Sequence, residues 1–159
     1  MSIKKATRLS RFKKTRELMS EKTRKLPFRE QVIKVRSFKK NSLKSQNKIS
    51  DLLKRSRGFK KDILESKISY KKGLDLAEKL HNEERALMGS FMSLTAAGKE
   101  LFGDKFDSSG LEHRVKENKL ELVVHSTYHD LVDVQNLHYG LIAELRKLKA
   151  REDYVAKRS

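Results

Sequence analysis

A ladder of apolar side chains, alternately three and four residues apart, constrains this chain more than any other sequence feature. Its members are Ile49, Leu53, Ser56, Phe59, Ile63, Ser66, Tyr70, Leu74, Ala77, Leu80, Glu84, Leu87, Phe91 and Leu94. Only Ser56, Ser66 and Glu84 break the apolar run. A mean step near 3.5 residues keeps one side of a helix facing a partner helix. The sequence therefore predicts one long helix over residues 28–95, about 100 Å in length.

A second ladder follows a stretch rich in turn-forming residues at 98–110. Glycine, aspartate and serine in that stretch predict a turn, and the short connection favours an antiparallel return helix over 111–157. The ladder of the return helix is Leu120, Val124, Tyr128, Leu131, Val134, His138, Leu141, Leu145 and Leu148. The predicted fold class is all-α, with long antiparallel helices that share a coiled-coil-like seam. Because one return helix is too short to cover the whole seam, we also expect a homodimer.

Pro27 predicts the boundary between an N-terminal arm and the long helix, because proline fits best in the first turn of a helix. We expect residues 1–26 to form the arm and residues 27–159 to form a long helical hairpin. Ala6, Leu9, Phe12 and Met19 share an arc of about 140° on a helical wheel among basic residues. The arm is therefore either a basic amphipathic helix or a disordered basic tail.

Positive charge is concentrated in the first part of the chain. Residues 1–61 contain 22 Lys and Arg against four acidic residues, whereas residues 62–159 contain 16 basic and 17 acidic residues. Such asymmetry predicts a partner that carries phosphate, either anionic lipid or nucleic acid. The candidate lipid- or phosphate-binding residues are Lys4, Lys5, Arg8, Arg11, Lys13, Lys14, Arg16, Lys54, Arg55, Arg57, Lys60 and Lys61.

Signals for catalysis and for a bound cofactor are weak. The segment 97–100 (AGKE) lacks the upstream glycine and the Ser or Thr of a phosphate-binding loop. His125 and His129 are one helical turn apart, but no third metal ligand is evident, so we expect no metal site. The absence of cysteine, of a long apolar run and of a secretory signal predicts a cytoplasmic protein. Gly58 and Gly73, inside the predicted helix, mark either kinks or close helix contacts.

Two short segments resemble BAR domains of the endophilin and amphiphysin type. Residues 144–158 (ELRKLKAREDYVAKR) are similar to the family segment in which a Leu-x-x-Leu run leads to basic residues and an Asp-Tyr or Asp-Phe pair. Residues 20–23 (SEKT) resemble the end of the N-terminal amphipathic helix of that family. The resemblance implies a crescent-shaped homodimer that binds curved anionic membrane, as in endocytosis. Domains of that family have three long helices, and Ser159 lies where the second would still continue, so the BAR-like domain is expected to be either truncated or completed by a second protomer.

The leading hypothesis is a non-catalytic, peripheral membrane protein that dimerises and binds anionic lipid through its basic N-terminal half. An RNA- or ribosome-binding helical protein is the alternative, because basic helices also bind nucleic acid phosphate. A cytoskeletal or scaffold coiled coil is a third interpretation. No cofactor is expected in any of the three.

Overall fold

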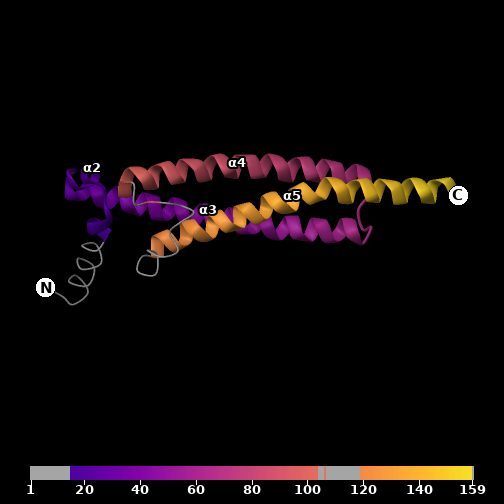
Figure 1. The fold of residues 1–159 in the computed structure, drawn as a ribbon, viewed down its shortest axis with the longest axis horizontal. Coiled ribbons are helices and arrows are strands. Elements are labelled where there is room, and N and C mark those ends of the chain that lie inside the picture. Colours follow the sequence, from indigo (N-terminus) through magenta and orange to yellow (C-terminus); the bar gives the residue numbers. More distant parts are fainter. Residues whose placement is uncertain (1–14, 104–105, 107–118, 159) are drawn as a thin grey trace. The chain divides into compact units, whose positions relative to one another are not determined.

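The computed structural model describes residues 15–103, 106 and 119–158, with side chains described for all of these except 119–127 (Figure 1). The helices are α2 (Glu21–Arg24), α3 (Phe28–Leu64), α4 (Tyr70–Phe102) and α5 (Lys119–Arg158). No strand occurs in the described part of the chain, which confirms the all-α prediction. α3 begins directly after Pro27, as the proline predicts. The chain forms two compact units: unit 1 is Met1–Lys44 with Phe91–His125, and unit 2 is Ser45–Ser90 with Ser126–Ser159.

The single long helix predicted across the first ladder is wrong, because a turn at 65–69 separates α3 from α4. Ser66 adopts a left-handed conformation with φ of 53°. Its backbone N–H donates to the carbonyl of Ile63 at 3.1 Å, and Lys67 N–H donates to the carbonyl of Asp62 at 2.9 Å. These two bonds form a Schellman motif, which terminates a helix by satisfying its last carbonyl groups. Such turns usually use glycine, and because glycine is absent here, residue types alone did not predict the turn.

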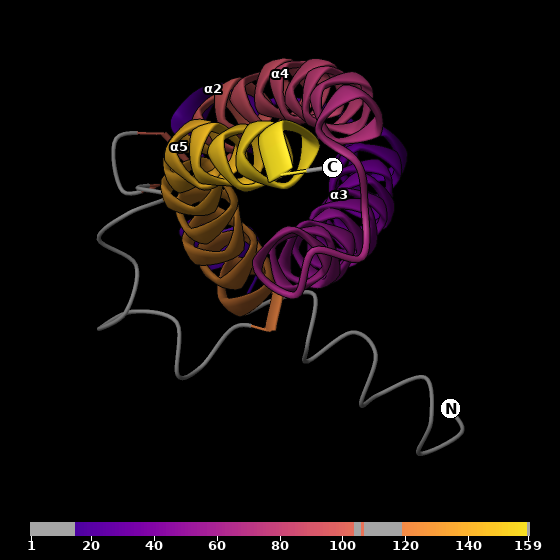
Figure 2. The same cartoon turned by 90° about the vertical axis from the view of Figure 1, so that its right-hand side faces the viewer.

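Two side chains of α5 hold the ends of this turn in unit 2. Arg151 Nη2 donates to the carbonyl of Ile63 at 3.1 Å, near the end of α3. Tyr70 N–H, at the start of α4, donates to Glu152 Oε1 at 2.8 Å. A cation near a helix C-terminus and an anion near an N-terminus are both electrostatically favourable. Figures 1 and 2 show the turn lying beside the C-terminal part of α5. These contacts make α5 antiparallel to α4 in this unit, as predicted for the return helix.

The core of unit 2 is formed mainly by ladder positions of α3, α4 and α5. Its buried apolar residues are Ile49, Leu52, Leu53, Phe59, Ile63, Leu80, Leu87, Leu131, Val134, Leu141, Leu145 and Leu148. In unit 2 the turn at 65–69 folds the second part of the predicted long helix back on the first, so most of the seam there is covered within one chain, although Leu74 is 45% exposed. The seam therefore does not by itself require a second chain, and the homodimer stays a prediction.

The core of unit 1 is aromatic. The ring centroids of Phe38 lie 5.8 Å from those of Phe102 and of Phe106, in edge-to-face geometry, and Phe102 stacks on Phe106 at 6.0 Å. All three side chains are buried. Gly98 lies against this cluster, since a Cβ atom there would meet the Phe106 ring at 2.4 Å. Close approach of the ring to the α4 backbone thus requires glycine at this position.

The last part of the predicted N-terminal arm is packed in unit 1. Ser20 N–H donates to the carbonyl of Leu101 at 2.7 Å, and the hydroxyls of Ser20 and Thr23 donate to the carbonyl of Glu100 at 2.9 and 3.2 Å. Met19, which directly precedes Ser20 in the sequence, is also buried. These bonds satisfy carbonyl groups that the end of α4 leaves without a helical partner. The arm therefore contributes to the fold at residues 19–23, whereas residues 1–14 lie outside the described part.

Candidate functional site

The first candidate site is a row of basic side chains on α3 in unit 2. Lys54, Arg57 and Lys61 are exposed and lie within about 60° of one another on a helical wheel, opposite the buried face. Lys61 approaches the exposed Glu65 carboxylate at 4.0 Å. Lys54 and Arg57 form no ion pair with any residue in the described part of the chain. We call these three residues the unit 2 basic row.

The other two residues predicted for this cluster have different surroundings. Arg55 pairs with Glu83 through both of its terminal nitrogens and with Asp51 through Nε at 2.9 Å. The hydrogen bonds that the Arg55 guanidinium donates to Glu83, with a smaller contribution from the bond to Asp51, raise its pKa, although partial desolvation opposes them. Lys60 is half-buried. Arg55 therefore links α3 to α4, and the predicted five-residue cluster is divided.

The α3 helix carries a second set of basic side chains in unit 1. Arg29, Arg36, Lys40 and Lys44 are exposed and lie within about 80° of one another on the helical wheel. None of the four forms an ion pair with another described residue, whereas Lys34 pairs with Glu100 at 3.9 Å. We call these four residues the unit 1 basic row. The sequence predicted basic character for this part of α3 but did not select these side chains.

The predicted contacts in the N-terminal arm are mostly outside the described residues. This applies to Lys4, Lys5, Arg8, Arg11, Lys13 and Lys14. Arg16 is exposed in the short helical stretch at 15–18. None of the helices in the described part of the chain combines the length and hydrophobicity that crossing a membrane requires.

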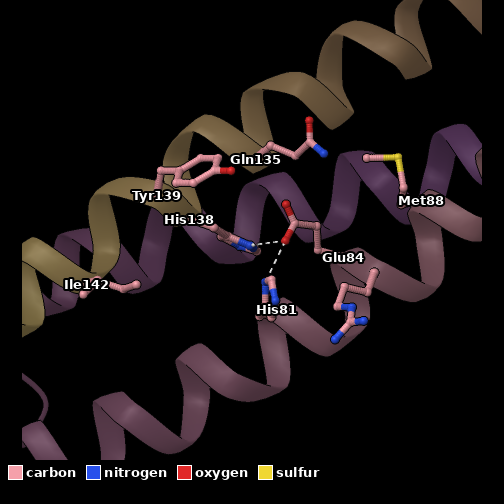
Figure 3. A pocket seen from close by; sticks show the side chains of 8 residues that line it. His81, Glu84, Met88, Gln135, His138, Tyr139 and Ile142 are labelled. Atoms are coloured by element: carbon pink, nitrogen blue, oxygen red, sulfur yellow. Dashed lines mark hydrogen bonds and ion pairs between the residues drawn. The ribbon is translucent and has the colours of Figure 1, made fainter.

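The second candidate site is a polar cluster in the core of unit 2, formed by one side chain from α3 and by side chains from α4 and α5, the latter drawn in Figure 3. The carboxylate oxygen Oε2 of Glu84 lies 3.0 Å from His81 Nδ1 and 3.3 Å from His138 Nδ1. The other ring nitrogen of His138, Nε2, is hydrogen-bonded to Ser56 Oγ at 2.9 Å. We call these four residues the His–Glu cluster.

Burial raises the free-energy cost of a charged side chain in the His–Glu cluster. The side chains of Glu84 and His138 are 9% and 8% exposed, whereas that of His81 is 59% exposed. Among the described residues, the two histidines are the ion-pair partners of Glu84. A buried carboxylate is costly unless it is paired and hydrogen-bonded. The Glu84 carboxylate therefore lies in the core, and the described residues that pair with it are two titratable histidines.

A pocket of about 420 Å³ adjoins this cluster. Its lining residues are His81, Glu84, Arg85, Met88, Gln135, His138, Tyr139 and Ile142, all from α4 and α5. Figure 3 shows the imidazoles of His81 and His138 directed toward the Glu84 carboxylate from opposite helices. The mixed lining accommodates water or a small polar ligand at the edge of the bundle.

The connections within the cluster resemble those of a catalytic triad, with a hydroxyl on one imidazole nitrogen and a carboxylate near the other. Ser56, however, is 0% exposed and lies on the buried face of α3. A substrate carbonyl has no access to its Oγ atom in this packing. The geometry thus does not support acyl transfer by this serine, and the expectation of a non-catalytic protein stays a prediction.

The His–Glu cluster was not predicted from the sequence. The histidines considered there were His125 and His129, of which His129 is exposed and the His125 side chain lies outside the described residues. The available signal was the set of polar interruptions in the two apolar ladders: Ser56, Glu84 and His138 all occupy ladder positions. Polar residues at such positions in different helices are expected to pair with one another.

Comparisons with protein-family models, with curated proteins and with solved structures give no match to this chain.

Proposed function

We propose that this protein is a non-catalytic, BAR-type helical protein that binds anionic membrane surfaces through the outer face of α3. The observation that carries the proposal is the unit 2 basic row, in which Lys54 and Arg57 are exposed without an ion-pair partner among the described residues. The resemblance of residues 144–158 to the corresponding segment of endophilin- and amphiphysin-type BAR domains supports the BAR-type part of the proposal. The unit 1 basic row offers the same chemistry within its own unit.

The mechanism is electrostatic. Each Lys or Arg near an anionic leaflet contributes about 1 kcal/mol, and the attraction decays within a Debye length of about 8–10 Å. The three side chains of the unit 2 basic row therefore supply about 3 kcal/mol in each chain. A homodimer, also part of this proposal, would present two copies and raise the avidity without any new contact.

Burial of aromatic side chains favours lipid over RNA as the anionic partner. Single-stranded nucleic acid is bound by basic grooves in which aromatic side chains stack on the bases. Of the three aromatic residues of α3, Phe38 and Phe59 are buried and Phe28, at the start of the helix in unit 1, is exposed, so the part of α3 that carries the unit 2 basic row has no exposed aromatic side chain. Phosphate contacts alone would then have to supply RNA affinity. A diffuse basic face without stacking residues fits a headgroup surface better.

Co-sedimentation with phosphatidylserine-containing vesicles tests the proposal. Reversing the unit 2 basic row with Lys54→Glu, Arg57→Glu and Lys61→Glu should abolish most vesicle binding at physiological salt. Changing Lys54 and Lys61 to Arg should leave binding nearly unchanged, because a surface attraction requires charge and not a defined shape.

Reversal of three exposed lysines on α4, Lys71, Lys72 and Lys79, is the matched control for total charge. Circular dichroism of every variant checks that the helices remain. Equal loss of binding in the α4 control would show that net charge, and not the α3 face, determines binding. Stronger binding to RNA than to vesicles at matched ionic strength would replace lipid by nucleic acid as the partner.

A further inference from the structure

The His–Glu cluster has the donor set of a metal site. We propose that His81, Glu84 and His138 bind one divalent transition-metal ion, with Zn²⁺ as the first candidate, and that the ion joins α4 to α5 in unit 2. Two imidazole nitrogens and one carboxylate oxygen suit zinc and its neighbours in the transition series, whereas magnesium and calcium prefer oxygen ligands alone. This site is independent of the membrane-binding proposal.

The spacing of the three donor atoms fits a small ion. Glu84 Oε2 lies 3.0 Å from His81 Nδ1 and 3.3 Å from His138 Nδ1, and the ligand atoms of the three residues lie within 4.8 Å of one another. Tetrahedral zinc with bonds of about 2.0–2.1 Å separates its ligand atoms by about 3.3–3.4 Å. Small side-chain rotations therefore bring all three atoms to bonding distance. His81 and Glu84 are three residues apart on α4, which places them on one face of the helix.

His138 Nδ1 provides the second, independent indication of a ligand. It is buried and has no hydrogen-bond partner in the described part of the chain, although it points into the cluster. The nearby Glu84 oxygen, at 3.3 Å, lies outside hydrogen-bonding geometry. A buried nitrogen without a partner is destabilising. A cation between this nitrogen and the carboxylate satisfies both atoms.

Ser56 orients His138 for this role. Its Oγ atom lies 2.9 Å from Nε2, the ring nitrogen that does not face Glu84. When Nε2–H donates to Ser56 Oγ, the proton is held on Nε2 and the lone pair of Nδ1 is free to bind a metal. A hydrogen bond to the remote nitrogen of a metal-binding histidine commonly fixes its tautomer in this way. Ser56 is thus a positioning residue and not a ligand.

A metal ion also accounts for the buried charge. The Glu84 carboxylate is paired only with histidines among the described residues, and a histidine is charged only when protonated. A divalent ion supplies positive charge beside the carboxylate when both histidines are neutral, which is the state in which imidazoles bind a metal. The adjoining pocket leaves the fourth coordination position open to water, as in zinc sites with three protein ligands.

Zinc titration of the full chain, after treatment with a chelator, tests the proposal. We expect one Zn²⁺ per chain by competition with a chromogenic chelator, and a rise in melting temperature on binding. Co²⁺ should give the intense visible absorption of a four-coordinate site. His81→Ala should raise the zinc Kd at least about 100-fold, and Ser56→Ala about 10–100-fold, the range for residues that support a ligand. Because the His81 side chain is mostly exposed, its variant should retain the fold.

His129→Ala is the matched control, since it removes an exposed histidine outside the cluster. It should bind zinc as the wild type does. Glu84→Gln, which keeps the shape of the side chain, should lose both the affinity and the cobalt spectrum. Unchanged zinc affinity in the His81→Ala variant, or loss of binding in His129→Ala alone, would overturn the proposal. Failure of the wild type to bind zinc at micromolar concentration would overturn it as well.

Discussion

The two units of this protein build their cores from different chemistry. Unit 1 packs the rings of Phe38, Phe102 and Phe106 against one another. Its buried polar side chains are neutral, and they are Thr23, Gln31 and Ser42. Unit 2 packs aliphatic ladder residues but includes the buried Glu84 and His138 side chains at the same interior. Shape complementarity determines the first core, whereas the second also depends on satisfying a charge. The same kind of helical seam can thus hold either a neutral interior or one with a buried ionisable pair.

Removing an aromatic ring from unit 1 should have the largest effect. Phe102→Ala is expected to lower the free energy of unfolding by about 3–5 kcal/mol, because it leaves a cavity between two rings. Chemical denaturation monitored by circular dichroism measures the change. Phe28→Ala, at a side chain that is 53% exposed, should stay within about 0.5 kcal/mol of the wild type. Similar losses in both variants would contradict the aromatic core.

Breaking the polar cluster of unit 2 should cost about 3 kcal/mol. His138→Leu removes a partner of Glu84 and leaves the carboxylate buried with only one histidine. Replacing Ser56 with Ala and both Glu84 and His138 with Leu should restore most of the stability, because no unpaired charge remains. Denaturation in the presence of a chelator compares the two variants. A triple variant as unstable as His138→Leu would mean that packing, and not charge, explains the loss.

Glycine positions sharpen the comparison between the two cores. Gly98→Ala should cost about 1–3 kcal/mol, because a Cβ atom would meet the buried Phe106 ring at 2.4 Å. Gly73→Ala should cost less, since its Cβ would meet only a terminal methyl of Leu145, at 2.6 Å. Gly58 has no atom within 4 Å, so Gly58→Ala should stabilise the helix by about 1 kcal/mol. Thermal melts of the three variants test this order of stabilities. A Gly73→Ala variant less stable than the Gly98→Ala variant would contradict it.

The smallest expected effect concerns the turn between α3 and α4. Ser66→Gly should raise the stability by about 1 kcal/mol, because glycine adopts the left-handed conformation without the Cβ penalty. Ser50→Gly, at an exposed position inside α3, should instead lower it by about 0.5 kcal/mol. Urea denaturation distinguishes the two signs. Destabilisation by Ser66→Gly would show that the turn does not have this backbone geometry.

Much of the fold followed from residue spacing. The ladder positions from Ile49 to Ile63 and from Leu131 to Leu148 are buried, and α3 starts after Pro27, as predicted. The basic character of α3 was also evident from composition. The separate roles of Lys54 and Arg55 were not evident from the sequence, because Glu83, the partner of Arg55, is contributed by another helix.

Residue spacing and residue type predicted local features: helical periodicity, the faces that become buried and the helix start that a proline imposes. The tertiary structure decided the turn at 65–69, where a serine takes a conformation that Arg151 and Glu152 support from α5. It also decided that Ser56, Glu84 and His138 meet. The physical reason is the same in both cases. A polar residue at a ladder position looks like a break in the apolar pattern when only the sequence is considered. Its partner lies on a helix that is distant in sequence, so only the packing of the helices identifies it.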